Sequence, residues 1–386
     1  MKITDVKTYV VDMYRANFVF IEIETDEGIT GVGEATLEYR EKAVVQAIED
    51  WREFLIGKDP LDTELIQMHL ERDTYWRYGP VLSSALSGID IALWDIKGKY
   101  YGAPVYQLLG GKVREGLPIY VNAWFAGAKT TPEFVEKAKE TVAKGFRALK
   151  WDPFGSAYLN LTKQELVDSI DRVAAIREAV GNGVDLLIEC HGRFNMTTSV
   201  KIARALEGLD VAFIEEPLHV GRIDLYKRLK DQINIPIAAG ERCYNRHEAC
   251  SLIESGAIDV VQPDICHVGG ITSLKKVASV AEMNYINVSP HNPMGAGANA
   301  ATMHVMSTCM NFTYLETMVN DVDWRKDVVT ETCYMKDGLL CLSDAPGIGI
   351  ELHKEAFDAH PYKPVTLRHY DGRLTEIRTE NSKNWF

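Results

Sequence analysis

The sequence predicts an α/β protein: a TIM-type (β/α)7β barrel with an α+β capping domain built from the N-terminal segment and the C-terminal tail. Two observations predict the barrel. Short apolar runs recur along the chain, each ending in a polar or ionisable side chain, and apolar residues at helical spacing lie between them. The acids Glu189, Glu215 and Glu241 end three successive runs at intervals of 26 residues, about one strand, one helix and two short connections.

Eight of these runs qualify as strands. In chain order they are Pro118–Asn122, Ala148–Asp152, Leu186–Glu189, Ala212–Glu215, Ile237–Glu241, Val260–Asp264, Ile286–His291 and Phe312–Glu316. Intervening segments such as 166–180 and 199–209 carry helix-spaced apolar residues and end near Gly181 and Gly208. A repeated βα unit with polar groups at the carboxyl end of each strand is typical of a barrel with its active site on that face. We expect residues 116–330 to form it.

The residues before the barrel have a different pattern. Two strands, Val19–Thr25 and Gly31–Ala35, are predicted around a turn at 26–28, and a further strand begins near the N-terminus. Apolar helical patterns cover Lys42–Leu55 and Val81–Tyr100. We therefore expect an α+β capping domain at residues 1–115.

The C-terminal segment, 331–386, carries turn sequences at 336–338 and 345–347 and strand-like pieces without helices. We expect it to return to the capping domain and complete it. The glycine pairs Gly31/Gly33 and Gly295/Gly297 lack the strand-turn-helix setting of a dinucleotide site. They predict positions where the backbone approaches another segment closely.

The composition excludes several classes of partner. The chain has 386 residues, 46% of them hydrophobic and 25% charged, which suits a barrel with a smaller domain. Its formal charge of −13, without basic clusters, argues against nucleic acid and anionic membrane surfaces as partners. Seven cysteines without Cys-x-x-Cys spacing fit a reducing compartment. With neither a signal peptide nor a membrane-spanning apolar run in the sequence, we expect a cytoplasmic protein.

The three evenly spaced acids predict a metal site. Because carboxyl ends of neighbouring parallel strands lie at one edge of a barrel, Glu189, Glu215 and Glu241 should converge there. Three converging anions are unfavourable unless a cation neutralises them, and an oxygen-only ligand set suits Mg²⁺. The alternative is that each acid binds a lysine or a helix N-terminus; the equal spacing of all three favours the metal.

A histidine and an acid on adjacent predicted strands indicate proton transfer. Asp264 can fix the tautomer of His291 and stabilise its imidazolium, so that His291 acts as a base. His191 follows the strand on the opposite side of the barrel, where it can act as an acid. The alternative for His291 is an ordinary hydrogen-bonding histidine at a strand end.

Six short motifs carry a resemblance to a known family. In order they are Glu189 after its apolar run, Ile214–Pro217 (Ile-Glu-Glu-Pro), Gly240-Glu241, Gln262-Pro263-Asp264, Pro290-His291 and Glu316. This order resembles the enolase superfamily, in its mandelate racemase subgroup, over essentially the whole chain. Residues 88–99 are similar to a cap helix of the sugar-acid dehydratases, and Leu149–Gly155 and Glu189–Asn195 look like the gluconate and galactonate dehydratases.

The resemblance implies a fold, a cofactor and roles. The implied Mg²⁺ ligands, with Mn²⁺ as a possible substitute, are Glu189, Glu215 and Glu241. Asp264 and His291 are implied as the base dyad, His191 as the acid, and Glu316 as a residue that assists the substrate carboxylate. For Glu316 we expect a raised pKa beside the other anions, the alternative being a structural contact. A homo-oligomer, between dimer and octamer, is also expected.

Two positions depart from the subgroup's pattern. Racemases carry Lys-x-Lys where this chain has Lys150 and Asp152, and the ligand at the position of Glu189 is often an aspartate. Lys150 is expected to balance charge at the metal site or to contact the substrate carboxylate, the alternative being an ion pair with Asp152. We place Asp152 among the substrate-binding residues. Glu216 is expected to support the metal ligands without joining them.

The capping domain offers candidate contacts to a polyol chain. From the family's architecture we assign Trp76, Arg77 and Tyr78 to substrate binding, together with the loop around 14–17. Their donors and stacking faces suit a hydroxylated chain. An exposed surface cluster is the alternative.

The predicted function is Mg²⁺-dependent dehydration of a sugar acid. An aldonate with a 2R centre, such as D-gluconate or D-galactonate, would give the 2-keto-3-deoxy acid through an enediolate. A racemase or epimerase is the nearest rival, although Asp152 in place of a lysine counts against two opposed bases, and a lactone cycloisomerase is another. A zinc amidohydrolase would need His-x-His on the first barrel strand, which Tyr120-Val121-Asn122 does not provide. A non-catalytic binding barrel would lack a ligand or base, and none is lacking here.

Overall fold

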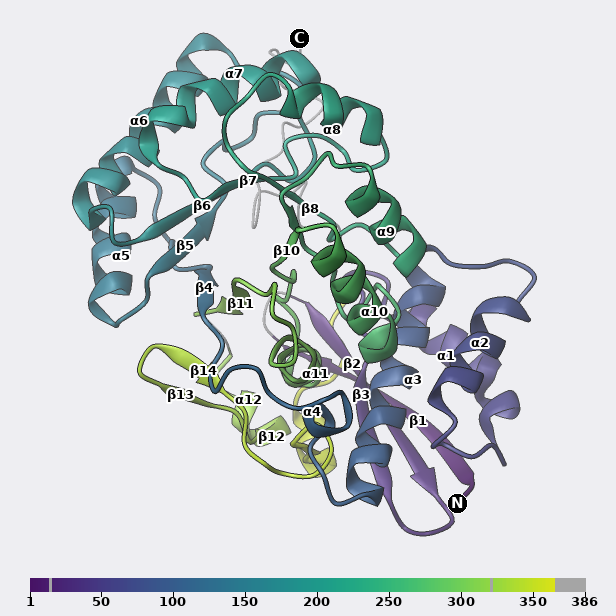
Figure 1. Cartoon of the computed structure of the whole chain (residues 1–386). Helices are drawn as coiled ribbons and strands as arrows, with labels where there is room; N and C mark the ends of the chain where they lie inside the picture. The colour runs from purple at the N-terminus through teal and green to yellow at the C-terminus, as the bar shows by residue number, and fades with distance from the viewer. Residues whose placement is uncertain (14–15, 320–321, 365–386) are drawn as a thin grey trace.

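The computed structural model describes residues 1–13, 16–319 and 322–364 (Figure 1). Its centre is an eight-stranded parallel sheet in the order β10-β9-β8-β7-β6-β5-β4-β11. The strands are β4 (Ile119–Asn122), β5 (Ala148–Trp151), β6 (Asp185–Glu189), β7 (Phe213–Glu215), β8 (Ile237–Ala239), β9 (Val260–Val261), β10 (Asn287–Val288) and β11 (Leu315–Met318). Each of the eight predicted runs contributes one strand.

The two end strands of this sheet meet just before β11. Val288 of β10 forms a parallel bridge with Phe312. Its N–H donates to the carbonyl of Asn311 at 2.9 Å, and its carbonyl accepts from the N–H of Thr313 at 3.0 Å. The sheet therefore curls into a ring, and the predicted barrel fold is confirmed.

A helix follows each of the first seven barrel strands. These helices are α5 (Thr131–Ala143), α6 (Lys163–Val180), α7 (Met196–Leu206), α8 (Ile223–Lys230), α9 (Arg246–Glu254), α10 (Gly270–Met283) and α11 (Ala296–Met306). A short 3-10 helix, η1 (Glu207–Leu209), extends α7. Capping boxes start α5 at Thr130 and α6 at Thr162, where hydroxyl and glutamate side chains satisfy the first free N–H groups.

Successive side chains of a barrel strand point to opposite faces of the sheet, so the barrel has two core layers. One layer fills the inside of the barrel with Tyr120, Leu187, Phe213, Ala238 and Val260, all buried. The intervening strand residues face outward and pack against the helices. This period of two also sends polar residues at the strand ends into the mouth of the barrel.

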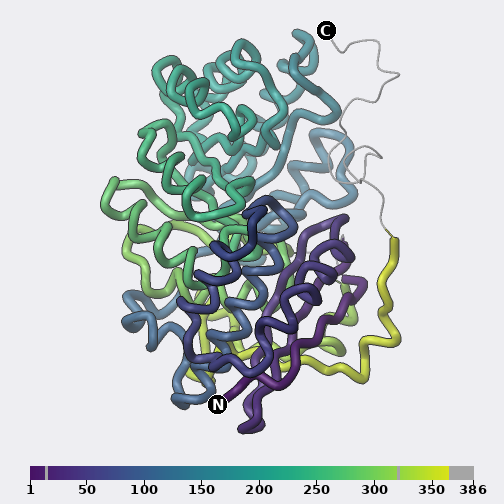
Figure 2. Tube along the Cα trace, turned by 90° about the vertical axis from the view of Figure 1, so that its right-hand side faces the viewer, coloured from purple at the N-terminus to yellow at the C-terminus, as the bar shows by residue number. Residues whose placement is uncertain are grey.

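The N-terminal segment forms an antiparallel sheet covered by helices (Figures 1 and 2). Its strands are β1 (Ile3–Asp12), β2 (Asn17–Thr25) and β3 (Thr30–Glu34), and its helices are α1 (Glu41–Leu55), α2 (Thr63–Arg72) and α3 (Gly79–Tyr100). The strand and helix predictions agree with β2, β3, α1 and α3. Helix α2 was not predicted, because its ten residues carry too short a periodic pattern.

The paired glycines mark close packing, as predicted. A Cβ at Gly31 or Gly33 of β3 would overlap backbone carbonyl oxygens of α3, and one at Gly295 would lie 2.6 Å from the carboxylate of Glu34. β3 therefore lies against α3 at backbone distance. Neither glycine pair forms a phosphate-binding loop.

The C-terminal residues, in yellow in Figure 2, run beside the N-terminal sheet. The N–H of Asp12 donates to the carbonyl of His360 at 2.9 Å, Lys354 pairs with Glu22 at 2.8 Å, and the ring of Phe357 contacts Tyr9. The elements here are α12 (Arg325–Val328), β12 (Val329–Glu331), β13 (Tyr334–Lys336), β14 (Leu339–Cys341), β15 (Ile350–Leu352) and η2 (Lys354–Ala359), and α4 (Val105–Leu108) precedes the barrel.

The tail differs from expectation in two details. It contains the short 3-10 helix η2, and Leu340 of β14 pairs with Leu117, next to the barrel. Part of the tail therefore packs on the barrel side. The remainder, 365–386, lies outside the described residues. The domain boundaries at 115 and 330 stay predictions.

Candidate active site

Glu189, Glu215 and Glu241 converge at the carboxyl ends of β6, β7 and β8. One carboxylate oxygen of each lies within 4.8 Å of the others, in a group that could hold a metal ion. Glu189 Oε2 is buried and makes no hydrogen bond to any described residue. Three converging carboxylates, with one buried oxygen among them that lacks a hydrogen bond, fit a hard divalent cation such as Mg²⁺.

Lys150 of β5 lies among these acids. Its Nζ is 2.6 Å from Glu215 Oε1, 3.3 Å from Glu189 Oε2 and 3.4 Å from Glu316 Oε1. Lys150 does not form an ion pair with Asp152, which was the alternative to its expected role at the metal site. Burial and the charge of Glu189 raise the pKa of Glu215 to about 8, against the lowering effect of Lys150. Lys150 thus offsets the negative charge of this buried group.

His291 and Asp264 form the predicted dyad. Nδ1 of His291 lies 2.7 Å from Asp264 Oδ2, and Nε2 lies 3.4 Å from Glu241 Oε2. The other Asp264 oxygen accepts from the N–H of Cys266 at 2.7 Å. Burial lowers the pKa of His291, but the hydrogen bond to Asp264 and the charge of Glu316 outweigh it, so the pKa is raised. The geometry gives His291 a fixed ring orientation toward the metal site.

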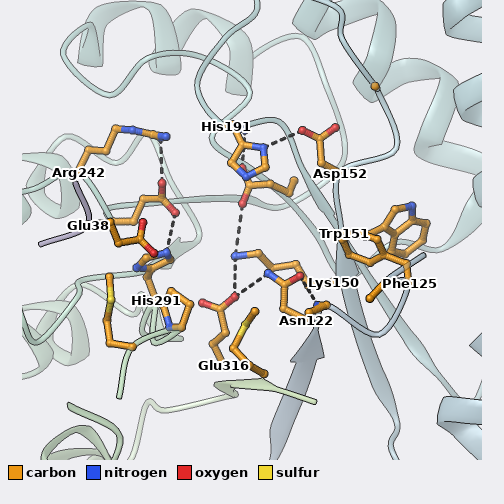
Figure 3. A pocket seen from close by; sticks show the side chains of 18 of the residues that line it. Glu38, Asn122, Phe125, Lys150, Trp151, Asp152, His191, Arg242, His291 and Glu316 are labelled. Carbon is orange, nitrogen blue, oxygen red and sulfur yellow. Dashed lines mark hydrogen bonds and ion pairs between the residues drawn. The ribbon is translucent and has the colours of Figure 1, made fainter. Parts of the chain in front are cut away.

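His191 lies beyond the end of β6 and is paired with Asp152. Its Nδ1 is 2.7 Å from Asp152 Oδ2 (Figure 3). Arg193 Nη2 lies 2.7 and 2.5 Å from the two oxygens of the same carboxylate. The structure therefore brings the predicted acid together with the residue assigned to the substrate. Arg193 was not singled out from the sequence.

Glu316 of β11 is held as an acceptor. Its oxygens accept from Asn122 Nδ2 and from the N–H of Asn292, both at 3.0 Å. Burial by itself raises the pKa of Glu316. The charges of Lys150 and His291 outweigh this effect, and the pKa is lowered to about 2. The raised pKa expected from the sequence is therefore wrong, because that expectation omitted Lys150 as a direct neighbour.

An ion pair between a half-buried arginine and a buried glutamate lies beside the metal-site acids. Arg242 contacts Glu216, and its Nη1 lies 3.0 Å from Glu241 Oε1. The side chain of Glu216 is fully buried. Each partner directly follows a metal-site acid in the sequence, so the pair ties the ends of β7 and β8 together.

Part of this group lines a cavity of about 1030 Å³: Lys150, Asp152, Glu189, His191, Glu241, Arg242, His291 and Glu316. Its walls also include residues that sequence reasoning missed: Leu37, Glu38, Tyr39, Asn122, Phe125, Phe134, Arg172, Met294 and Met318. The cap thus contributes the segment after β3, and the loop after β4 forms another wall. Pocket residues on such loops have no periodic pattern that would mark them.

The three cap residues assigned to the substrate lie elsewhere. Among the described residues, Trp76, Arg77 and Tyr78 do not line this cavity. Trp76 is 80% exposed, Arg77 donates to the carbonyl of Arg72 at 2.9 Å, and the ring of Tyr78 faces His247. Trp76 and Arg77 are exposed and Tyr78 is half-buried, which agrees with the alternative of a surface cluster. Of the loop at 14–17, residues 14–15 lie outside the described chain.

Comparison with known proteins agrees with this architecture. A model of the N-terminal domain of mandelate racemase and muconate lactonizing enzyme matches residues 2–110, and a model described as enolase C-terminal domain-like matches residues 133–356. The chain belongs to this enolase superfamily. The resemblance noted from the six motifs is thereby confirmed.

Curated members of the superfamily include sugar-acid dehydratases. A D-gluconate dehydratase of Thermoproteus tenax is 35% identical, over 90% of this chain and 71% of the relative. A D-galactonate dehydratase of Xanthomonas euvesicatoria is also 35% identical, over 97% of this chain and 100% of the relative.

Solved structures agree. An enolase superfamily member from Salmonella Typhimurium is 35% identical with a TM-score of 0.88, covering 93% of this chain and 98% of that one. The 3,6-anhydro-D-galactonate cycloisomerase of Zobellia galactanivorans is 28% identical with a TM-score of 0.84, covering 94% and 100%.

Proposed function

We propose that this enolase superfamily member dehydrates an aldonate, such as D-gluconate or D-galactonate, to the 2-keto-3-deoxy acid through an enediolate. The observation that carries the proposal is the pair of histidine–carboxylate dyads, His291–Asp264 and His191–Asp152, whose two histidines line one cavity together with Glu189 and Glu241. One dyad can remove a proton while the other donates one. The names of the two dehydratase relatives support the substrate class.

His291 would take the C2 proton of the substrate. Asp264 accepts from Nδ1, which leaves Nε2, on the side of the metal-site glutamates, as the basic nitrogen. The hydrogen bond also stabilises the imidazolium formed when the proton is taken up. We expect a 2R centre in the substrate, following the family's placement of this histidine.

Charge develops on the substrate carboxylate as the C2 proton leaves. The residues Glu189, Glu215 and Glu241 would hold Mg²⁺, or Mn²⁺, which when bound supplies Lewis-acid stabilisation of that charge. Lys150 adds a buried positive charge beside the same site. Glu316, held by two hydrogen bonds, keeps Lys150 in place from the other side.

His191 would protonate the 3-hydroxyl as it leaves as water. It lies after β6, separated by three strands of the ring from β10, which precedes His291. The two groups can therefore act at neighbouring carbons of one substrate. Loss of water then leaves an enol, which tautomerises to the 2-keto-3-deoxy acid.

A panel of aldonates with Mg²⁺ tests the proposal directly. The assay measures 2-keto-3-deoxy products with a carbonyl-specific reagent, and exchange of the C2 proton in deuterated buffer by NMR. His291→Asn should lose both exchange and dehydration, whereas His191→Asn should lose dehydration more severely than exchange. His219→Asn, at an exposed histidine, serves as the matched control.

The alternatives give different products. Epimerised acid without a keto product would identify an epimerase, and a lactone or ring-opened isomer would identify a cycloisomerase. Native C2 exchange in His291→Asn would place the base elsewhere, with Lys150 the first suspect. Either of the first two results would replace the proposed dehydration, and the third would reject His291 as the base.

The metal assignment has its own test. Chelation followed by dialysis should abolish activity, and Mg²⁺ or Mn²⁺ should restore it. Glu215→Gln should be inactive with an unchanged circular dichroism spectrum. Full activity of the metal-depleted protein would reject Mg²⁺ as cofactor.

We further propose a cytoplasmic homo-oligomer. The free cysteines of the described chain fit a reducing compartment, and no described helix is long and apolar enough to span a bilayer. Light scattering after size exclusion would give the assembly, expected between dimer and octamer. A monomer at micromolar concentration would contradict it.

A further inference from the structure

We propose that Asp152 is a positioning residue that orients His191, and that it does not bind the substrate. The inference deepens the proposed dehydratase function and rests on it for the role of His191. It assigns this chain a second histidine–aspartate dyad, at the position where the racemases of the subgroup carry a lysine. Three observations lead to it.

The first observation is the placement of Asp152 by its strand. Lys150 and Asp152 are two residues apart at the end of β5, and alternate strand residues point to the same side. Both side chains therefore lie in the barrel mouth and line the cavity. Lys150 turns to the acids of β6, β7 and β11, while Asp152 turns to the segment after β6.

The second observation is that protein donors occupy the Asp152 carboxylate. Oδ1 accepts from the N–H of Phe154 at 2.9 Å and from Arg193 at 2.7 Å. Oδ2 accepts from Arg193 at 2.5 Å and lies 2.7 Å from His191 Nδ1. A carboxylate has about four acceptor sites, so a substrate hydroxyl would have to displace one of these partners.

The third observation is that the partners are themselves fixed. Arg193 is buried and donates through Nη1 to the carbonyl of Gly155 at 2.8 Å. The backbone of His191 has a φ of +52°, in the left-handed region, and its N–H donates to Glu189 Oε1 at 2.5 Å. A non-glycine residue in that region requires support from its surroundings. Asp152 holds the ring and Glu189 holds the backbone.

The consequence is a defined ring orientation, in which the imidazolium form of His191 would donate its proton from Nε2. Nδ1 of His191 faces Asp152, so Nε2, on the opposite edge of the ring, is turned away from it. Arg193 offsets the charge of the Asp152 carboxylate, which allows a buried acid to remain a hydrogen-bond acceptor. The His291–Asp264 dyad has the same Nδ1 pairing, but within the described residues no arginine pairs with its aspartate. The two dyads therefore have the same histidine–aspartate pairing and differ in whether a described arginine offsets the charge of the aspartate.

Kinetics of Asp152→Ala separate positioning from substrate binding. We expect kcat for dehydration to fall by ~10–100-fold, the size typical of a lost supporting hydrogen bond. KM should stay within about threefold, since no ground-state contact is removed, and C2 exchange by His291 should persist. Asp171→Ala, an exposed aspartate on α6, should match the wild type.

A double variant makes the test stricter. If Asp152 acts only through His191, the pair Asp152→Ala/His191→Asn should dehydrate no more slowly than His191→Asn alone. Asp152→Asn, which keeps an acceptor oxygen, should recover part of the loss. A rise in KM with unchanged kcat, or additive losses in the double variant, would overturn the inference.

A readout without substrate keeps the two proposals apart. In histidine-labelled protein, the Nδ1–H of a histidine donating to a carboxylate gives a low-field proton signal. We expect the signal of the His191–Asp152 dyad to vanish in both Asp152→Ala and His191→Asn. The signal of the His291–Asp264 dyad should remain in these two variants and vanish in Asp264→Ala. If no aldonate is turned over but this pattern holds, the dehydratase proposal fails and the dyad stands. A wild-type spectrum unchanged by Asp152→Ala would reject the dyad.

Discussion

Nζ of Lys150 lies 2.6 Å from Oε1 of Glu215, and both side chains are almost completely buried. Burial of a single ion pair is roughly neutral for stability, but removal of one partner leaves an uncompensated charge. Here the lysine also lies 3.3 Å from Glu189 and 3.4 Å from Glu316. Lys150 is therefore an internal counter-ion for the acidic group that we propose binds Mg²⁺.

Lys150→Met should destabilise the metal-free protein. We expect a loss of ~3–5 kcal/mol in the free energy of unfolding, the cost of breaking a buried ion pair from one side. Added Mg²⁺ should raise the melting temperature of the variant more than that of the wild type, since a divalent cation replaces the lost charge. Thermal unfolding with chelator and with Mg²⁺ measures both effects.

Lys137→Met provides the control, because Lys137 pairs with Glu140 on the surface of α5. Exposed pairs contribute ~0–1 kcal/mol. Equal melting of Lys150→Met and wild type in chelator would show that Lys150 is not needed as a counter-ion.

Glu34 of the cap should support the loop that follows His291. Its carboxylate accepts from the N–H groups of Gly295 and Ala298, at 2.8 and 3.0 Å, at the start of α11. Glu34→Ala leaves these two buried N–H groups without their carboxylate acceptor. Each unsatisfied group lowers the free energy of unfolding by up to ~1–3 kcal/mol. We expect lower stability and a lower kcat, measured by denaturant unfolding and by the dehydration assay.

The exposed Glu53 on α1 provides a matched glutamate-to-alanine control. Loss of stability without any change in kcat would mean that Glu34 joins the cap to the barrel without influencing the base.

Gly33→Ala should separate β3 from α3. A Cβ at Gly33 would overlap the carbonyl oxygen of Gly88, and backbone atoms cannot move aside as a flexible side chain can. Overpacking of this kind costs ~1–3 kcal/mol, so the midpoint of urea unfolding should fall. Gly208→Ala, where no atom lies within 4 Å of the added Cβ, is the control. An unchanged midpoint for Gly33→Ala would contradict the close packing.

His304 should make the fold sensitive to acid. It is 1% exposed, and Nδ1 accepts from the N–H of Tyr106 at 3.1 Å. Burial lowers the pKa of His304 from 6.5 to about 4. The hydrogen bond with the backbone of Ile348 acts in the opposite direction but does not outweigh burial. Between these two pH values the unfolded chain binds a proton that the native protein does not, so stability falls as the pH drops from 6.5 toward about 4.

The full effect of this group is about 3 kcal/mol. His304→Gln keeps an acceptor for Tyr106 but cannot be protonated, so its unfolding free energy should depend less steeply on pH in that window. Chemical denaturation at several pH values gives the slope, with His219→Gln as the exposed control. Identical slopes for His304→Gln and wild type would remove His304 as the cause.

The sequence alone determined the barrel and the acidic group at its mouth. Glu189, Glu215 and Glu241 recur with the period of a βα unit, and parallel strands place equivalent ends at one edge whatever the helices contain. The pairing of His291 with Asp264 followed from the same rule, because β9 and β10 are neighbours. Local periodicity is therefore sufficient to predict the strands and the residues at their ends wherever the βα unit repeats.

Tertiary structure decided the features that depend on side-chain direction and on loops. Asp152 meets His191 and Arg193, about 40 residues away, and no periodic pattern specifies which way a side chain turns at a strand end. Trp76 lies outside the cavity, whereas Tyr39 lines it. Loop paths and charge neighbours are set by packing between distant segments. The pKa of Glu316 is lowered for that reason, because Lys150 of β5 reaches it past the intervening strand β4.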